Sequence, residues 1–253
     1  MRINKYLAEC GVCSRRKSEA LILDGRVSID GKVVTSLAVD VDPENARVLL
    51  DGKIVHPINK HIYLKMNKPK GYVCTMADDR GRKTVIDLLP EKYAGKRIFP
   101  IGRLDYDTEG LLLLTTDGDL AQALSHPSNE IPKTYIAKIE GSISEAELAK
   151  LRKGVEIDGV MTKKCKVKVL EKDEKSTRVE ITITEGRNRQ IRKMFESVQK
   201  NVTFLKRVSV GNIRLGGVTR GTVRELRPEE LDYHGILYKI SRSILAAAFI
   251  YLV

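Results

Sequence analysis

The chain has 253 residues, of which 42% are hydrophobic, and it carries a formal net charge of +12 at pH 7. This hydrophobic share is enough for a normal packed core, so we expect one large domain or two smaller ones. The basic excess favours nucleic acid or another anionic surface as the partner, without deciding between them.

The cysteines and the first residues narrow the class of protein further. Cys10 and Cys13 form a C-x-x-C pair, but no second such pair and no Cys/His pair completes a tetrahedral zinc site. The N-terminus carries the polar residues Arg2, Asn4 and Lys5 and lacks the apolar core of a signal peptide. We therefore expect free thiols, no metal site and a cytoplasmic protein.

Two short helices are predicted within the first 24 residues. Apolar residues between Ile3 and Ala8 mark the first helix, which Gly11 ends. Ser14 is a good N-cap for the second helix, and Gly25 stands where a C-terminal glycine belongs.

Three consecutive cations, Arg15, Arg16 and Lys17, occupy the first turn of the second helix. Cations at this end oppose the helix dipole, so a structural role alone would disfavour them. The helix amides at the same place favour phosphate, and the three cations would add to that attraction. We expect an RNA-binding role, with a merely solvated helix start as the alternative.

Two similar segments follow, RVSIDGKVV at 26–34 and RVLLDGKIV at 47–55. In each, an Asp-Gly pair between short apolar runs predicts a hairpin on a type I′ turn. Because two copies are too few for a solenoid, we expect two hairpins in one small sheet. The segment His56–Lys60 breaks the pattern and is the expected linker.

Short strands and helices alternate irregularly after the linker, which favours an α+β class with a mostly antiparallel sheet. The expected strands are 62–66, 72–75, 111–115, 135–140, 164–170, 177–184 and 203–210, and the expected helices are 85–89, 120–125, 145–153 and 190–198.

An acid-rich loop, GRLDYDTEG at 102–110, leads into four consecutive leucines. A carboxylate at the mouth of a buried strand has a fixed position and a low local dielectric, and both suit a catalytic acid. A calcium loop would need a glutamate at the twelfth position counted from Asp105, where Thr116 stands. A pair of glycosidase-like acids stays possible in principle, but the sequence places no second carboxylate.

The C-terminal part concentrates the positive charge and then turns apolar. Residues 181–253 hold 13 basic and 6 acidic side chains, which raises the expectation of a polyanionic partner. The last ten residues, 244–253, are uncharged and mostly apolar. A membrane-spanning helix needs about 20 residues, so we expect no membrane span and a segment that packs on the core or on a partner.

The first half of the chain resembles the small RNA-binding domain first described in ribosomal protein S4. The resemblance is carried by RINKYL at 2–7, SRRK at 14–17, GRV at 25–27 and DGKVV at 30–34. It implies an RNA-binding domain over 1–58 in which Arg15, Arg16 and Lys17 contact RNA.

The remainder closely resembles bacterial rRNA pseudouridine synthases, in the branch that contains the small-subunit and large-subunit uridine isomerases. The motifs are GRLD at 102–105 with the leucine run and TTDG at 115–118, NKPKGY at 67–72, KTY at 133–135 and EGRNRQIRKM at 185–194. The residues of the last motif are more similar to those of the large-subunit enzymes than to those of the small-subunit enzyme. The resemblance implies a small N-terminal α/β RNA-binding domain, a mostly antiparallel catalytic domain over 61–232, and an apolar tail over 233–253 outside the pattern.

The resemblance also implies a reaction and roles for residues. Uracil would be detached from ribose, turned and rejoined through carbon 5, without cofactor or metal. Asp105 would be the catalytic acid, acting as nucleophile or as base, and Arg192 would pair with Asp105 and keep it ionised. Tyr135 would stack on the target base and help to remove its proton. Arg103 would fill the space that the flipped base leaves, because extruding a base costs a few kcal/mol.

Other residues complete the expected site. Ile191 would pack against the base, and Arg187 and Arg189 would bind phosphate. From the residues alone, Arg192 could instead be a phosphate contact and Tyr135 an ordinary core residue, while Asp107, Glu109, Asp117 and Asp119 are expected to be turn and surface acids.

The expected partner is ribosomal RNA or a pre-ribosomal particle, bound by a monomer without a small-molecule cofactor. A ribosome-associated RNA-binding protein without activity is the alternative from another class, and small-subunit rRNA is the alternative substrate. The target uridine does not follow from the sequence.

Overall fold

The computed structural model describes residues 1–231. The expected apolar tail, 233–253, lies outside the described residues, and so does residue 232, the last of the expected catalytic domain. The chain forms two compact units. Unit 1 consists of Met1–Ile62 with Glu91–Ile98 and Thr116–Gly118. Unit 2 contains Tyr63–Pro90, Phe99–Thr115 and the chain from Asp119 onward. The expected domain boundaries stay a prediction.

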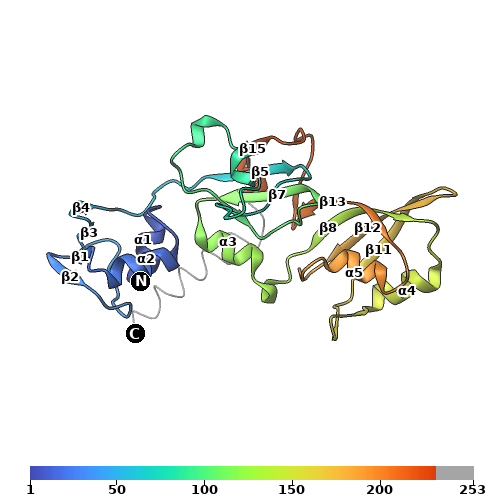
Figure 1. Ribbon diagram of the computed structural model, residues 1–253, viewed down its shortest axis with the longest axis horizontal. Helices are drawn as coiled ribbons and strands as arrows, with labels where there is room; N and C mark the ends of the chain where they lie inside the picture. The colour runs from blue at the N-terminus through green and yellow to red at the C-terminus, as the bar shows by residue number, and fades with distance from the viewer. Residues whose placement is uncertain (232–253) are drawn as a thin grey trace. The chain divides into compact units, whose positions relative to one another are not determined.

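Unit 1 begins with the two expected helices, α1 (Ile3–Glu9) and α2 (Arg15–Leu23), drawn in blue in Figure 1. Ser14 caps α2, because its hydroxyl accepts a hydrogen bond from the Lys17 amide at 3.2 Å. The buried side chains of both helices pack with the first strands into one small core, made of Ile3, Tyr6, Leu7, Cys13, Leu21, Ile22, Val27, Val41 and Val48.

Four short strands complete unit 1 in the order β2-β1-β3-β4. Their bounds are β1 Val27–Ile29, β2 Lys32–Val34, β3 Val48–Leu50 and β4 Lys53–Ile54. Both connecting Asp-Gly pairs have positive φ, at 48° and 81° for Asp30 and Gly31 and at 50° and 76° for Asp51 and Gly52. A type I′ turn requires this backbone at both central residues, so the two-hairpin prediction is confirmed.

Unit 2 is built on a nine-stranded sheet. Seven strands lie in the order β11-β12-β8-β13-β7-β5-β15, with β14 beside β13 and β6 beside β7. Their bounds are β5 Tyr63–Lys68, β6 Phe99–Ile101, β7 Glu109–Thr115, β8 Lys133–Glu140, β11 Lys166–Lys172, β12 Ser176–Ile183, β13 Val202–Val210, β14 Ile213–Arg214 and β15 Val223–Glu225. Among the described strands of this sheet only β13 and β7 run parallel, which confirms the mostly antiparallel α+β class.

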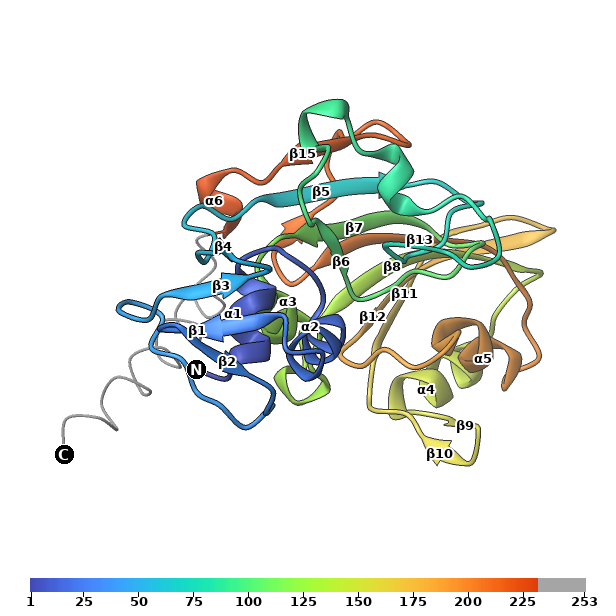
Figure 2. The same cartoon turned by 60° about the vertical axis from the view of Figure 1, so that its left-hand side comes forward.

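Short helices and one small hairpin complete the described elements of the chain. Figures 1 and 2 both show α4 and α5 side by side next to β11 and β12, with the β9–β10 hairpin beyond them in Figure 2. Their bounds, with the other helical turns, are α3 Gly118–Ser125, α4 Glu145–Lys153, α5 Gln190–Glu196, α6 Pro228–Leu231, β9 Glu156–Ile157, β10 Val160–Met161, and the 3₁₀ turns Val85–Leu88, Glu91–Tyr93 and Pro127–Asn129. No helix within residues 1–231 is long and apolar enough to cross a membrane.

One predicted strand is absent. Residues 72–75 form only an isolated bridge, in which Val73 pairs with Thr84. The amide of Val73 donates to Lys83 and its carbonyl accepts from Val85, but no further ladder follows. The apolar character of the segment therefore reflects partial burial and not strand pairing.

The parallel contact between β7 and β13 requires a glycine. Gly110 has φ +103° and lies opposite Arg207, and a Cβ at Gly110 would come within 2.2 Å of the Arg207 carbonyl oxygen. Any other residue would push the two strands apart. This position joins the acid-rich loop to the middle of the sheet.

Candidate active site

A pocket of about 170 Å³ opens in unit 2 beside the loop 102–108, among β8, β13 and the segment that leads into α5. It brings together residues that are far apart in the sequence. Six of the expected site residues line it, namely Arg103, Asp105, Tyr135, Arg187, Arg189 and Ile191. Arg192 lies on the first turn of α5 but is not among the lining residues.

The loop is held in place by a buried lysine. Lys68, at the end of β5, is fully buried, and its ammonium donates to the carbonyls of Pro69, Asp105 and Thr108 at 3.1, 3.0 and 3.0 Å. Burial lowers the pKa of Lys68, while the nearby Cys74 and Asp105 act in the opposite direction. Because two of its three acceptors bracket the loop turn, Lys68 sets where Asp105 stands.

Asp105 is half-buried and keeps its carboxylate free. No residue within 1–231 forms a hydrogen bond or ion pair with this carboxylate, whereas its backbone carbonyl accepts from Lys68 and from the Thr108 amide. Because Asp105 lines the pocket and no cation pairs with its carboxylate, this carboxylate is available to a ligand, and Asp105 is a functional candidate.

The expected ion pair between Arg192 and Asp105 is wrong. Arg192 pairs instead with Asp107, with 3.0 Å between Nη2 and a carboxylate oxygen, and its Nη1 donates to the Val202 carbonyl at 2.7 Å. The hydrogen bond to Val202 on β13 fixes the Arg192 guanidinium in a position where it contacts Asp107. Arg189 also pairs with Asp107, at 3.3 Å.

Glu109 is also not the surface acid that we expected. It is 9% exposed and pairs with Arg220 at 3.0 Å. Of the three acids in the loop, Asp107 and Glu109 are therefore neutralised by arginines, and Asp105 alone has an unpaired carboxylate. The loop thus distinguishes its three acids by their partners.

The wall of the pocket combines apolar and charged side chains. Tyr135 on β8 and Ile191 on α5 are both buried and both line the pocket. Arg103 is exposed, and its side chain forms no hydrogen bond or ion pair with another residue in 1–231. Three buried polar atoms near the loop have no partner within residues 1–231: Asn67 Oδ1, Thr108 Oγ1 and Arg192 Nε.

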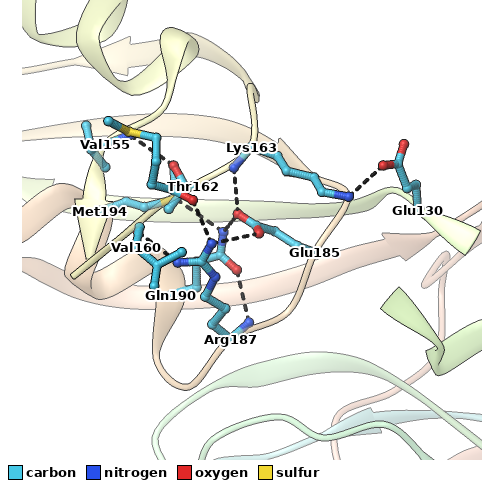
Figure 3. Close-up of polar contacts among 10 residues, drawn as sticks. Glu130, Val155, Val160, Thr162, Lys163, Glu185, Arg187, Gln190 and Met194 are labelled. Atoms are coloured by element: carbon cyan, nitrogen blue, oxygen red, sulfur yellow. Dashed lines mark hydrogen bonds and ion pairs between the residues drawn. The ribbon is translucent and has the colours of Figure 1, made fainter. Parts of the chain in front are cut away.

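Arg187 is already used by the protein, as Figure 3 shows. Its two terminal nitrogens donate to the carbonyls of Val160 and Met161 on β10 at 2.9 and 2.7 Å. Glu185 lies 3.5 Å from the same guanidinium and accepts from the Gln190 amide nitrogen at 2.5 Å. Arg187 therefore holds the β9–β10 hairpin against the segment 185–190, and its phosphate-binding role stays a prediction.

The predicted cations of α2 have a different environment. Arg15, Arg16 and Lys17 are exposed, and their side chains form no hydrogen bond or ion pair with any residue in 1–231. Their charge is available to a ligand, which is what the RNA-binding prediction requires.

Two pocket residues were missed at the level of sequence. Lys133 stands two residues before Tyr135 on β8, and Arg207 stands opposite Tyr135 on β13. Strand periodicity could have indicated Lys133, because residues i and i+2 share a face. Arg207 could not be found this way, since the pairing of β13 with β8 is not visible in the sequence.

No group of three or more His, Cys, Asp or Glu side chains within residues 1–231 is arranged to hold a metal ion. In the loop itself, the acids that an EF-hand would use at positions three and five, Asp107 and Glu109, are paired with arginines. Burial raises the pKa of the Cys10 thiol to about 12 and of the Cys165 thiol to about 11, so both are poor ligands.

Comparisons with known proteins find similar sequences and a similar structure. The family model described as RNA pseudouridylate synthase matches residues 62–197, and the model of the S4 domain matches residues 1–48. The ribosomal large subunit pseudouridine synthase B of Bacillus subtilis is 44% identical over 232 residues, which cover 91% of this chain and 93% of that protein.

Two further matches span nearly the whole chain. An uncharacterized RNA pseudouridine synthase of Aquifex aeolicus is 43% identical over 232 residues, covering 91% of this chain and 92% of that protein. A crystal structure of a pseudouridylate synthase matches with a TM-score of 0.66 and 29% identity, over 92% of this chain and 98% of that one.

Proposed function

This chain belongs to the RNA pseudouridylate synthase family and carries an S4 domain ahead of the synthase domain, and on that premise we propose that it converts a uridine of large-subunit ribosomal RNA to pseudouridine with Asp105 as the catalytic acid. The observation that carries the proposal is the unpaired carboxylate of Asp105 at the pocket, beside two acids that arginines neutralise.

The chemistry exchanges one bond for another within a single nucleotide. The bond between N1 of uracil and C1′ of ribose breaks, the base turns, and a bond between C5 and C1′ forms. The proton on C5 is removed, and N1 receives a proton, so the reaction is an isomerisation without net oxidation. Asp105 acts as nucleophile towards the sugar or base or as base towards a sugar proton. Each of these routes needs a carboxylate oxygen that no cation already binds.

The neighbouring residues supply position and shape. Tyr135 stacks on the target base and helps to take the proton from C5, and Ile191 packs against the base. Both side chains are buried in the pocket wall, which supports these roles. Arg192 acts through Asp107: by fixing that acid it holds the loop, so it is a positioning residue and not a partner of the reacting carboxylate.

The target base must leave the RNA stack to enter this pocket, which costs a few kcal/mol. Arg103 fills the vacated space, since its exposed side chain is free and stands two residues before Asp105. Arg15, Arg16 and Lys17 of the S4 domain bind the phosphate backbone of the ribosomal RNA or of a pre-ribosomal particle. The name of the Bacillus subtilis relative supports large-subunit rRNA as the substrate.

The decisive experiment compares Asp105→Asn with the wild-type chain on unmodified large-subunit and small-subunit rRNA. We expect Asp105→Asn to lower pseudouridine formation by at least about 100-fold, as the loss of a reacting acid does. RNA affinity should stay within about threefold, because the substitution leaves the cations that bind the phosphate backbone, Arg15, Arg16 and Lys17, unchanged. Asp79→Asn, an exposed acid outside the pocket, is the matched control and should keep full activity.

Mapping the modified position on both RNAs tests the substrate. Pseudouridine on large-subunit rRNA alone supports the proposal, and pseudouridine on small-subunit rRNA alone would replace that substrate. If the Asp105→Asn variant keeps its activity, Asp105 is not the catalytic acid.

A further inference from the structure

A buried arginine of the pocket has no role in the mechanism above. Arg207 on β13 is 3% exposed and lines the pocket, and its Nε donates to the Leu111 carbonyl at 2.7 Å. Its two terminal nitrogens donate to no acceptor within residues 1–231, yet neither is sealed from solvent. The free end of the guanidinium therefore faces accessible space.

A second cation shares the same wall. Lys133 on β8 is half-buried, and its ammonium donates only to the Ile131 carbonyl, at 3.0 Å. Strand register places Tyr135 directly opposite Arg207, and Lys133 is two residues from Tyr135 on the same face. Burial lowers the pKa of Lys133, and the nearby positive charge of Arg207 lowers it further. Two cations thus stand close together beside the tyrosine.

Within residues 1–231, no acid of the pocket lining forms an ion pair with these two cations. The lining contains two acids, Asp105 and Glu185. Glu185 already accepts from the Lys163 amide and from Gln190, and it lies beside Arg187. Asp105 forms no ion pair with Lys133 or Arg207. Holding two like charges side by side without a directly paired acid is unfavourable, so their arrangement fits a site whose paired counter-charge arrives with the ligand.

We propose that Lys133 and Arg207 form an anion site in the wall of the catalytic pocket, and that it binds an RNA phosphodiester flanking the target uridine. The inference rests on the proposed function, because it takes the ligand of the pocket to be a nucleotide of RNA. Uracil is neutral and ribose is neutral, so the phosphodiester is the anionic group that a flipped nucleotide carries with it. The planar guanidinium presents two parallel donors, which suit phosphate oxygens.

Such a site would position the nucleotide for catalysis. A phosphate held beside Tyr135 fixes the sugar to which it is joined, and hence the orientation of C1′ towards Asp105. Lys133 and Arg207 are therefore positioning residues in this proposal, and they should act on binding of the nucleotide before they act on the bond exchange.

The test titrates the full chain separately with uridine, uridine 5′-monophosphate and uridine 3′-monophosphate. NMR spectroscopy measures the affinity for each compound. We expect one monophosphate to bind the wild-type chain about tenfold or more tightly than uridine, as a charge-assisted hydrogen bond would provide. This advantage should largely disappear in Lys133→Gln and fall to an intermediate level in Arg207→Lys, which keeps the charge but loses the paired donors. The preferred monophosphate identifies which flanking phosphate is bound.

Lys138→Gln is the matched control, because Lys138 lies on the same strand, is exposed and is outside this pocket. It should retain the full advantage. Thermal unfolding of each variant checks that it is folded. If Arg207→Lys does not fold, Lys133→Gln alone still tests the proposal. The proposal is overturned if both monophosphates bind no better than uridine, or if the advantage survives in Lys133→Gln. These binding results do not depend on pseudouridine formation, so they can fail or succeed separately from the proposed reaction.

Discussion

Two arginine-rich helix starts in this molecule have the same type of sequence and different environments. At the start of α2, Arg15 and Arg16 are exposed, and their side chains form no hydrogen bond or ion pair with any described residue. At the start of α5 and just before it, Arg187, Arg189 and Arg192 all have protein partners. Both segments predicted phosphate binding from their basic residues alone.

From this difference we expect phosphate binding where the charge of a basic cluster is not already paired within the protein. The arginines near α5 hold the β9–β10 hairpin and the acid-rich loop, so their first task is structural. The side chains of the α2 cations form no hydrogen bond or ion pair within residues 1–231. Their position opposes the helix dipole, and a bound anion would account for it. The following substitutions separate the two roles, from the largest expected effect to the smallest.

Arg192→Gln should lower the free energy of unfolding by about 2–3 kcal/mol, because it removes a buried donor to Val202 and the ion pair with Asp107. Urea unfolding monitored by circular dichroism measures this. Arg15→Gln is the control and should change stability by no more than about 0.5 kcal/mol. Equal stability of the two variants would show that the contrast between the helix starts is not structural.

Arg187→Gln should cost about 1–2 kcal/mol, since two donors to β10 carbonyls are lost at a partly exposed position. The loss should be local, and hydrogen exchange of the amides in 156–161 should accelerate more than exchange in β8. The salt dependence of RNA binding should not change. A decrease of about one in the salt slope would instead identify Arg187 as a phosphate contact.

The double substitution of Arg15 and Arg16 to Gln should leave stability unchanged and weaken RNA binding about tenfold. Each lost phosphate contact should reduce the salt slope by roughly 0.7–0.9, so the pair should reduce it by roughly 1.5. Filter binding of ribosomal RNA fragments between 50 and 200 mM salt, about the range where such slopes are measured, gives both numbers. Lys32→Gln on the exposed face of β2 removes one positive charge and is the control, and half the effect of the double substitution there would point to a non-specific loss of charge.

Arg189→Gln should have the smallest effect, about 0–1 kcal/mol in unfolding. Its ion pair with Asp107 joins side chains that are 44% and 43% exposed, and solvent screens such pairs. A double-mutant cycle with Asp107→Asn measures the coupling. A coupling above about 2 kcal/mol would mean that Arg189, and not Arg192, is the main anchor of the loop.

Local rules were sufficient where neighbouring residues decide the structure. The two Asp-Gly turns and the Ser14 cap follow from the residues themselves, and so does the buried strand of four leucines. Asp105, Tyr135 and Ile191 do meet at one pocket, as their motifs indicated.

Prediction failed where the outcome depends on the direction in which a side chain points or on residues that are distant in the sequence. The turn that Lys68 fixes leaves the Asp105 carboxylate without a partner among the described residues and brings Asp107 to Arg192, and residue types alone do not contain that information. Arg207 enters the pocket only because β13 pairs with β8 and β7, which lie far away along the chain. Strands of two or three residues, such as β14 and β15, are too short to leave a pattern.

The position of β13 also has a consequence for the order in which the enzyme matures. β13 separates β11-β12-β8 from β7-β5, and among the described strands no other pairing joins these halves. Tyr135 belongs to one half, and Asp105 precedes the other. Arg207 lies 72 positions after Tyr135 in the chain. At a synthesis rate of 5–20 residues per second, β13 emerges roughly 4–14 s after Tyr135. A nascent chain therefore has no active site until this late strand inserts, and we expect closure of that long loop to limit the rate at which activity appears.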